Sequence, residues 1–225
     1  MSTLADTLLA DAFMALAVAA VLGLLVGLAG GPVLRRLAEP DDTAPGGKIR
    51  YAALATPRFA QAVGAFVAAA ALSVLATGVP GEPRTWLAWP LATVGVLLVC
   101  IDAVTTWLPL RLTQGLWGLT VAAWLAACLA GAAWWPPLIG AAIAGGFFWL
   151  VWRISGSIGF GDVRLMPVIG AVAAAYGGQT LLAALVLGTA LGALTGLVHL
   201  IRHGRGPFPY GPSLVAGAFA ALAVG

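Results

Sequence analysis

The chain has 225 residues, of which 61% are apolar and only 8% are charged, and its mean hydropathy is +1.02. A soluble domain carries about 25% charged residues, so this composition excludes a water-soluble globular protein and indicates a lipid environment. The net charge of +3 comes from basic residues scattered over short connections, which does not favour a nucleic-acid partner.

The N-terminal segment begins a series of predicted membrane helices. It has no basic residue before its apolar run, and Arg35 and Arg36 follow that run, which is the reverse of a secretory signal peptide. We therefore expect a retained N-terminal transmembrane helix over residues 1–34 and a short cytoplasmic loop over residues 35–58. The remaining residues, 59–225, are expected to form a helical membrane core.

Apolar runs separated by glycine, proline and charged residues predict eight membrane helices, and hence an all-α polytopic membrane protein. The predicted limits are Leu8–Val33, Phe59–Val79, Trp86–Thr106, Gly115–Trp135, Leu138–Ser155, Val163–Tyr176, Thr180–Ile201 and Pro212–Gly225.

The basic residues predict the orientation of these helices. If the N-terminus lies outside the cytoplasm, ten of the eleven Lys and Arg residues fall in cytoplasmic connections, and Arg84 alone falls outside. This is the positive-inside pattern of membrane proteins, and adding or removing one helix would destroy it. The sequence therefore predicts that both termini lie outside.

The two cysteines, Cys100 and Cys128, lie within apolar runs and do not form a CxxC motif. They are interpreted as packing residues, and neither a metal ion nor a cofactor is expected.

Two aspartates are isolated in the apolar part of the chain. In the 143 residues after Glu82 the only acidic residues are Asp102, near the end of the third predicted helix, and Asp162, at the start of the sixth. The alternating topology places both near the cytoplasmic face. A charged side chain in the hydrocarbon costs about 2.5 kcal/mol or more, so such residues are candidates for function.

Two carboxyl groups that share a hydrated pocket hold one proton between them. One can then activate water while the other protonates a carbonyl oxygen, which allows amide hydrolysis without a metal ion.

The segment before the sixth predicted helix is rich in glycine. Val163–Tyr176 is short for a hydrocarbon core about 30 Å thick, so we expect the preceding GFGD segment to enter the protein as non-helical backbone. Gly159 and Gly161 would permit a tight or left-handed turn there. Pro109 is expected to end the third helix and to direct an extended segment towards the same pocket.

Three stretches together resemble a known family. GFGD matches the GxGD signature of intramembrane-facing aspartyl proteases, and with IDAVTTWLPLRLT and PFPYGPSLVAGA the chain resembles the prepilin peptidase (type IV leader peptidase) family. The resemblance implies that Asp102 and Asp162 are the catalytic pair. The supporting positions that it implies are Gly159, Gly161, Pro109, Arg164, Gly211 and Pro212.

The resemblance also implies a substrate and a location. The family removes a short basic leader from prepilin or pseudopilin proteins, just after a glycine and before a hydrophobic helix, at the cytoplasmic face of the bacterial or archaeal cytoplasmic membrane. The expected partners are these substrates, which serve type IV pili and protein secretion, and membrane lipid.

The chain departs from the family in its first connection. Many members carry a zinc-binding domain with cysteine pairs there and methylate the new N-terminus. Residues 35–58 contain no cysteine and are too few for that domain, so N-methyltransferase activity is not expected. Arg164 replaces a common lysine, and Tyr210 replaces a phenylalanine.

Other functions are compatible with the two aspartates. A small proton-coupled transporter could bind protons on them, although it would be expected to carry polar residues at mid-membrane. A protease of the signal-peptide-peptidase or presenilin type usually has a Tyr-Asp motif, whereas Ile101 precedes Asp102 here. A structural scaffold would leave the two acids unexplained.

Overall fold

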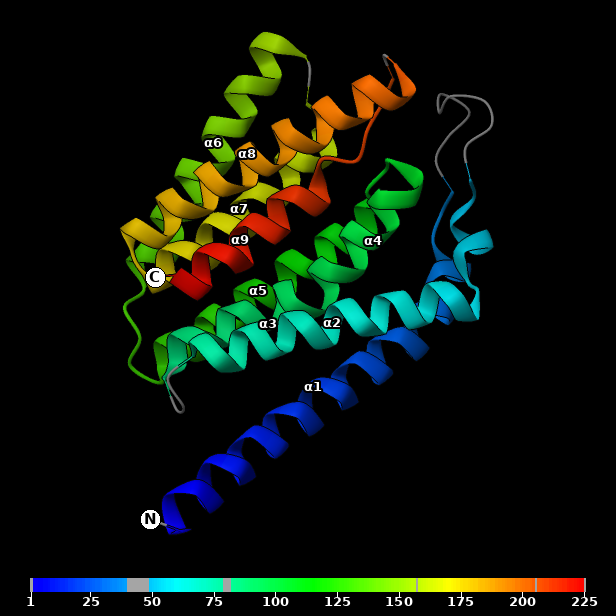
Figure 1. Cartoon of the computed structure of the whole chain (residues 1–225). Helices are drawn as coiled ribbons and strands as arrows, with labels where there is room; N and C mark the ends of the chain where they lie inside the picture. Colours follow the sequence, from blue (N-terminus) through cyan, green and yellow to red (C-terminus); the bar gives the residue numbers. More distant parts are fainter. Residues whose placement is uncertain (1, 40–48, 79–81, 157, 205, 225) are drawn as a thin grey trace.

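The computed structural model describes residues 2–39, 49–78, 82–156, 158–204 and 206–224, and these residues form helices joined by short connections (Figure 1). The longer helices are α1 (Ser2–Arg36), α2 (Pro57–Thr77), α5 (Leu110–Leu129), α6 (Trp135–Ser155), α7 (Phe160–Tyr176), α8 (Gly178–His203) and α9 (Gly211–Val224). A short 3₁₀ helix, η1 (Tyr51–Leu54), precedes α2. The third helical segment is composite: η2 (Pro83–Leu87), α3 (Ala88–Pro90), the π-helical turn η3 (Leu91–Gly95) and α4 (Val96–Thr105) follow one another directly. The all-α, multi-pass fold predicted from the sequence is confirmed.

In the described part of the chain, eight helical segments occupy the eight predicted positions, and six of them are long and apolar enough to cross a membrane. The other two, α7 with 17 residues and α9 with 14, are shorter than the roughly 20 residues that a crossing helix needs. The number of helices was therefore predicted correctly, and membrane crossing by α7 and α9 remains a prediction.

The predicted boundaries differ most for the fourth helix. It was expected over Gly115–Trp135, but α5 begins at Leu110 and ends at Leu129. Pro109 has extended backbone and immediately precedes the helix, and Gly131, with φ of 96°, turns the chain after it. The next helix, α6, begins at Trp135, before two prolines. Prolines are tolerated in a first turn because its N–H groups have no acceptor within the helix.

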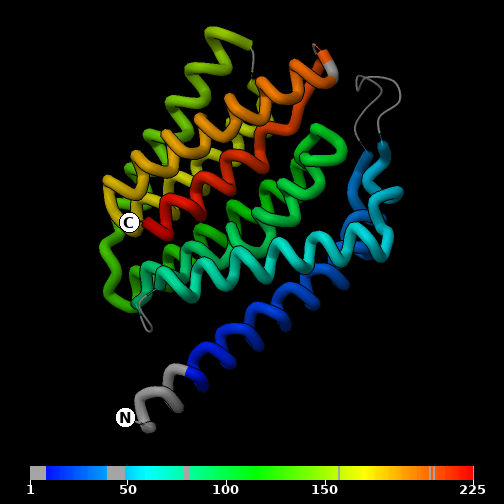
Figure 2. The backbone as a smooth tube through the Cα atoms, in the orientation of Figure 1, coloured from blue at the N-terminus to red at the C-terminus, as the bar shows by residue number. Residues whose placement is uncertain are grey.

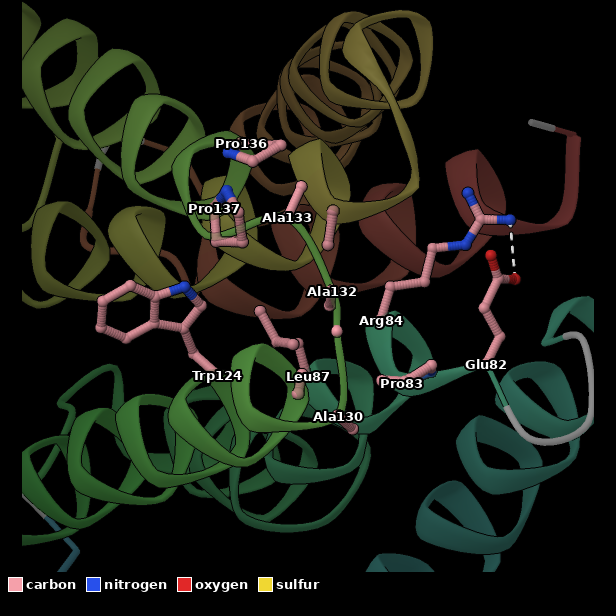
Figure 3. A pocket seen from close by; sticks show the side chains of 13 residues that line it. Glu82, Pro83, Arg84, Leu87, Trp124, Ala130, Ala132, Ala133, Pro136 and Pro137 are labelled. Atoms are coloured by element: carbon pink, nitrogen blue, oxygen red, sulfur yellow. Dashed lines mark ion pairs between the residues drawn. The ribbon is translucent and has the colours of Figure 1, made fainter.

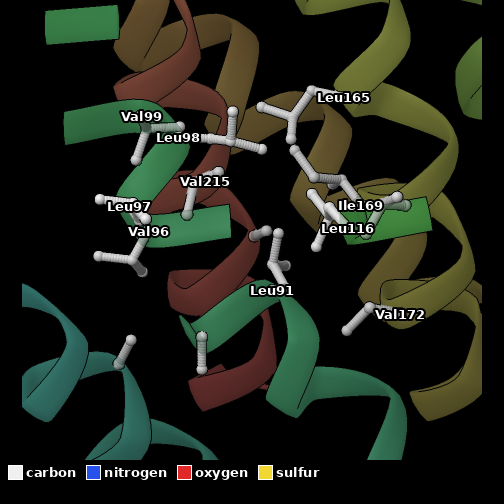
Figure 4. Close-up of a cluster of buried hydrophobic side chains, with 14 of the residues drawn as sticks. Leu91, Val96, Leu97, Leu98, Val99, Leu116, Leu165, Ile169, Val172 and Val215 are labelled. Atoms are coloured by element: carbon white, nitrogen blue, oxygen red, sulfur yellow. The ribbon is translucent and has the colours of Figure 1, made fainter. Parts of the chain in front are cut away.

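Two central elements form the interior of the protein. Helix α7 is buried along most of its length and packs against α5, α6, α8 and α9, while the third helical segment packs against α2, α5 and α9. Figure 4 shows where they meet: Leu98 of α4, Leu116 of α5 and Leu165 of α7 belong to one buried apolar cluster. The two aspartates therefore lie on the most enclosed helices of the fold.

Helix α1 lies at the edge of the bundle and packs mainly against α2 (Figure 1). Gly23 and Gly27 of α1 face the backbone of Gly64 and Ala60, so a side chain at either glycine would run into α2. The GxxxG spacing thus serves packing within one chain, as membrane helices use small residues to approach closely.

The first coloured turn of α1 and the last turn of α9 lie at the same end of the bundle (Figure 2). The described arginines at the helix ends, apart from Arg84, fall at the opposite end, since successive helices alternate in direction. This arrangement agrees with the predicted orientation, although which end faces the cytoplasm remains a prediction.

We expect the α6–α7 crossing to tolerate no additional atom. A Cβ at Gly140 would collide with the carbonyl oxygen of Gly170, whereas nothing lies within 4 Å of a Cβ at Gly146 on the same helix. Gly140→Ala should therefore lower the free energy of unfolding by about 1–3 kcal/mol, the usual cost of overpacking. Gly146→Ala, the matched control, should leave the apparent thermal midpoint in detergent unchanged or slightly raised. Equal midpoints for the two variants would contradict this packing.

Candidate active site

Asp102 lies in the last turn of α4, and its side chain is only 4% exposed. The helix ends three residues later, because Thr106 adopts a left-handed conformation with φ of 56°. Its N–H donates to the carbonyl oxygen of Asp102 at 2.7 Å. The prediction that Pro109 ends this helix was therefore wrong. Its predicted extended backbone was correct, and Pro109 leads into α5 instead.

Asp162 lies in the first turn of α7, and its side chain is 7% exposed. Gly159 is the residue before the helix, and its backbone N–H donates a hydrogen bond to the Asp162 carboxyl group. An acidic side chain at the third position of a helix commonly reaches back in this way. A Cβ on Gly159 would lie only 3.2 Å from Oδ2 of Asp162.

The GFGD segment was expected to be non-helical, and this was wrong. Phe160, Gly161 and Asp162 already belong to α7, and Gly159 has ordinary extended backbone with φ of −65°. The left-handed glycine of this connection is Gly156, with φ of 61°, which ends α6. The two motif glycines are required by close approach and not by backbone conformation.

Three segments that are far apart in the sequence converge around the two carboxyl groups. The backbone N–H of Gly211, at the start of α9, donates to Oδ2 of Asp102 at 3.1 Å. A Cβ on Gly161 would lie 3.0 Å from Leu108, which follows α4, so the GFGD segment lies directly against the connection after Asp102. The carboxyl groups of Asp102 and Asp162 are close enough to interact electrostatically. The structure thus brings the two predicted residues together.

Two tyrosines border this site and were not singled out from the sequence as site residues. Tyr51 of η1 is 3% exposed; burial raises its pKa to about 12, and negative charge on Glu39 and Asp102 contributes further. Burial, followed by negative charge on Asp162, also raises the pKa of Tyr210. Both phenols therefore stay protonated at neutral pH and can donate hydrogen bonds. No sequence motif pointed to Tyr51, because it lies in a connection that resembles no known motif.

Glu39 holds Tyr51 in place. Its carboxylate accepts the backbone N–H of Tyr51 at 3.0 Å and that of Ala52 at 3.3 Å, so it caps the start of η1. Glu39 and Tyr51 are therefore joined to each other, and η1 packs against α4. The predicted loop over residues 35–58 includes residues 40–48, which lie outside the described part of the structure.

Two other supporting residues, Arg164 and Pro212, lie next to the segments that carry the carboxyl groups and their donors. The guanidinium group of Arg164 lies 4.6 Å from the centre of the Phe160 ring, and its backbone carbonyl accepts the indole N–H of Trp117 at 2.8 Å. Arg164 thus ties the start of α7 to α5. Pro212 follows Gly211 in the first turn of α9, where a proline is tolerated.

A separate cavity of about 370 Å³ lies at the other end of the bundle (Figure 3). Glu82, Arg84 and Trp124 are among its lining residues, and an Arg84–Glu82 ion pair of 2.8 Å lies beside it. Neither aspartate lines this cavity, so it is distinct from the candidate active site. Within the described ranges, no three His, Cys, Asp or Glu side chains gather closely enough to hold a metal ion.

The comparison with known families agrees with this geometry. Residues 89–200 match the model of the Type IV leader peptidase family, and this region contains both Asp102 and Asp162. Comparison with curated proteins and with solved structures gave no significant match. Gly211 lies beyond the matched region, yet it donates a hydrogen bond to the first aspartate. On its sequence match, the chain belongs to the type IV leader peptidase family.

Proposed function

We propose that this membrane protein is an aspartic endopeptidase that removes the basic leader from type IV prepilin-like proteins at the cytoplasmic face of the membrane. The observation that carries the proposal is the convergence of three distant motifs on two buried carboxyl groups, Asp102 and Asp162. The family match supports leader-peptidase activity, and the geometry supports these two residues as the catalytic pair.

The chemistry follows from placing two carboxyl groups together. Their mutual repulsion disfavours double ionisation, so the pair holds one proton. The ionised carboxylate takes a proton from a water molecule as the water oxygen attacks the scissile carbonyl carbon. The protonated partner gives its proton to the carbonyl oxygen. The tetrahedral intermediate then breaks its C–N bond, and the proton taken from water passes to the leaving amine. As the C=O bond re-forms, a hydroxyl of the intermediate returns its proton to the second carboxylate, and the pair again holds one proton.

The surroundings of the pair suit this mechanism. Both aspartates are less than 10% exposed, and the apolar walls strengthen electrostatic interactions by keeping bulk water away. One backbone donor on each carboxyl group, Gly211 on Asp102 and Gly159 on Asp162, fixes the orientation of the two side chains. Fixed orientation is what general acid–base catalysis requires.

The proton-coupled transporter is the less favoured alternative. A transporter would use the two aspartates along a path through the membrane, whereas here both lie at helix ends on one side of the bundle. The family match also favours hydrolysis. We further propose that the protein acts as a peptidase without N-methyltransferase activity, because its first connection lacks the cysteine pairs of the bifunctional members.

The test is cleavage of a defined peptide by the purified protein in lipid bicelles. The peptide carries a basic leader, a glycine and an apolar helix, and mass spectrometry identifies the products. We expect one cut, directly after the glycine, with or without EDTA, since the two carboxyl groups activate water by themselves. Absence of cleavage in several lipid compositions would count against the peptidase. Activity lost in EDTA and restored by zinc would contradict the two-carboxyl mechanism.

A further inference from the structure

An apolar groove runs along the lipid-facing side of the bundle and ends beside Asp102. It lies between α2, α4 and α9, where α4 is flanked by the other two helices (Figure 1), and it encloses about 540 Å³. Its lining residues fall within Phe59–Ser73 of α2, Val96–Val104 of α4 and Pro212–Phe219 of α9. Apart from Ser73 and the thiol of Cys100, the described side chains that line it are apolar.

The groove is continuous with the candidate active site through two elements. On α4, the lining residue Ala103 directly follows Asp102 in the chain. On α9, the lining residue Pro212 directly follows Gly211, whose N–H donates to the Asp102 carboxyl group. One end of the groove therefore lies next to the Asp102 segment, and neither aspartate is among the described residues that line it. From that end it follows α2 from Phe59 to Ser73, which is 14 steps of 1.5 Å, or about 21 Å.

Small side chains lie between large ones along the groove. Ala62, Ala69 and Ala216 line it and are exposed, and Phe66, which also lines it, is 61% exposed. The alanines therefore leave space beside the phenylalanine ring. Small side chains allow another helix to approach closely, and membrane helices associate through such surfaces.

We propose that this groove binds the apolar helix of the substrate, with the N-terminal end of that helix at Asp102. The inference rests on the proposed function, and it adds the surface that recognises the substrate. A helix that enters from the Asp102 end places the peptide bond before its first turn at the two carboxyl groups, while the polar leader remains outside the groove. Recognition then comes from helix packing along α2, α4 and α9.

Filling the groove tests the proposal. Ala69→Phe and Ala216→Phe place a ring where the substrate helix would pack, and Ala142→Phe, at an exposed position on α6, is the matched control. We expect the two groove variants to raise KM for the leader peptide about tenfold, with kcat changed less than about twofold, because they remove binding and leave the chemistry intact. The control should have the KM of the wild type. Size-exclusion chromatography shows whether each variant is folded.

Photocrosslinking gives an independent readout. A leader peptide carrying a benzophenone side chain at successive positions of its helix should crosslink to α2, α4 and α9, and the Phe variants should reduce these crosslinks. The groove proposal would be refuted if the wild type cleaved the peptide and both groove variants kept its KM. It would also be refuted if the crosslinks were confined to α6 or α8. Either result would leave the proposed function unaffected. Failure of the wild type to cleave would overturn the proposed function itself, and the groove with it.

Discussion

Replacement of either aspartate by asparagine should abolish leader cleavage. Asp102→Asn and Asp162→Asn keep the size of the side chain but remove its ability to exchange a proton. General acid–base catalysis contributes about 10²–10⁴-fold, and both residues act in the same step, so each variant should lose at least about 10³-fold in kcat. The double variant should lose little more than either single one. Cleavage of the leader peptide in bicelles, followed over time by mass spectrometry, provides the rates.

The control for this pair is Asp11→Asn, since Asp11 is exposed on α1 and lies far along the helix from the site. It should cleave at the wild-type rate. The inactive variants should also keep their thermal midpoints, because a buried amide is easier to accommodate in this apolar interior than a buried charge. Retention of full activity by both single variants would refute the two-carboxyl mechanism. A large fall in the midpoint would instead indicate a structural role.

Composition and apolar periodicity were enough to predict the helices, because a chain with 8% charged residues can satisfy its backbone in lipid only by forming helices or a closed barrel. The two aspartates could also be chosen as candidates from the sequence, since an isolated acid in an apolar segment carries a cost that packing alone does not explain. Both signals depend on residue type and not on precise geometry.

The details around the site could not be predicted in the same way. The left-handed Thr106 ends α4 before Pro109, and nothing in its residue type indicates this, because threonine rarely adopts such backbone. Tyr51 lies near enough to Asp102 to interact with it electrostatically because η1 packs against α4. The two residues are about 50 positions apart in the sequence. Such contacts depend on tertiary packing, and a local pattern does not report them.

The role of the motif glycines shows the same limit. Their recurrence was interpreted as backbone freedom, but Gly159 and Gly161 adopt conformations open to any residue. A side chain at either position would meet a neighbouring group. A Cβ on Gly159 would approach the Asp162 carboxyl group, and a Cβ on Gly161 would approach Leu108. Gly211 belongs to the same class, since it meets Asp102. Gly159 and Gly211 therefore set the distance between the backbone and the two carboxyl groups, and Gly161 sets the distance between α7 and the connection after α4.

Gly211→Ala should consequently reduce kcat without unfolding the protein. Its Cβ would lie 2.8 Å from Oδ2 of Asp102 and 3.4 Å from a methyl group of Val99, so the carboxyl group must move and its hydrogen bond from the Gly211 N–H must lengthen. A displacement of about 1 Å in a catalytic group can cost 10²-fold, and we expect a loss of about 10–100-fold in kcat with KM nearly unchanged. Gly206→Ala is the matched control, because Gly206 lies in the connection just before α9 with nothing within 4 Å of its Cβ, and this variant should cleave like the wild type. If Gly211→Ala raised KM alone, the contact between Gly211 and Asp102 would serve substrate binding. If Gly211→Ala cleaved as fast as Gly206→Ala, the orientation of Asp102 would not depend on Gly211.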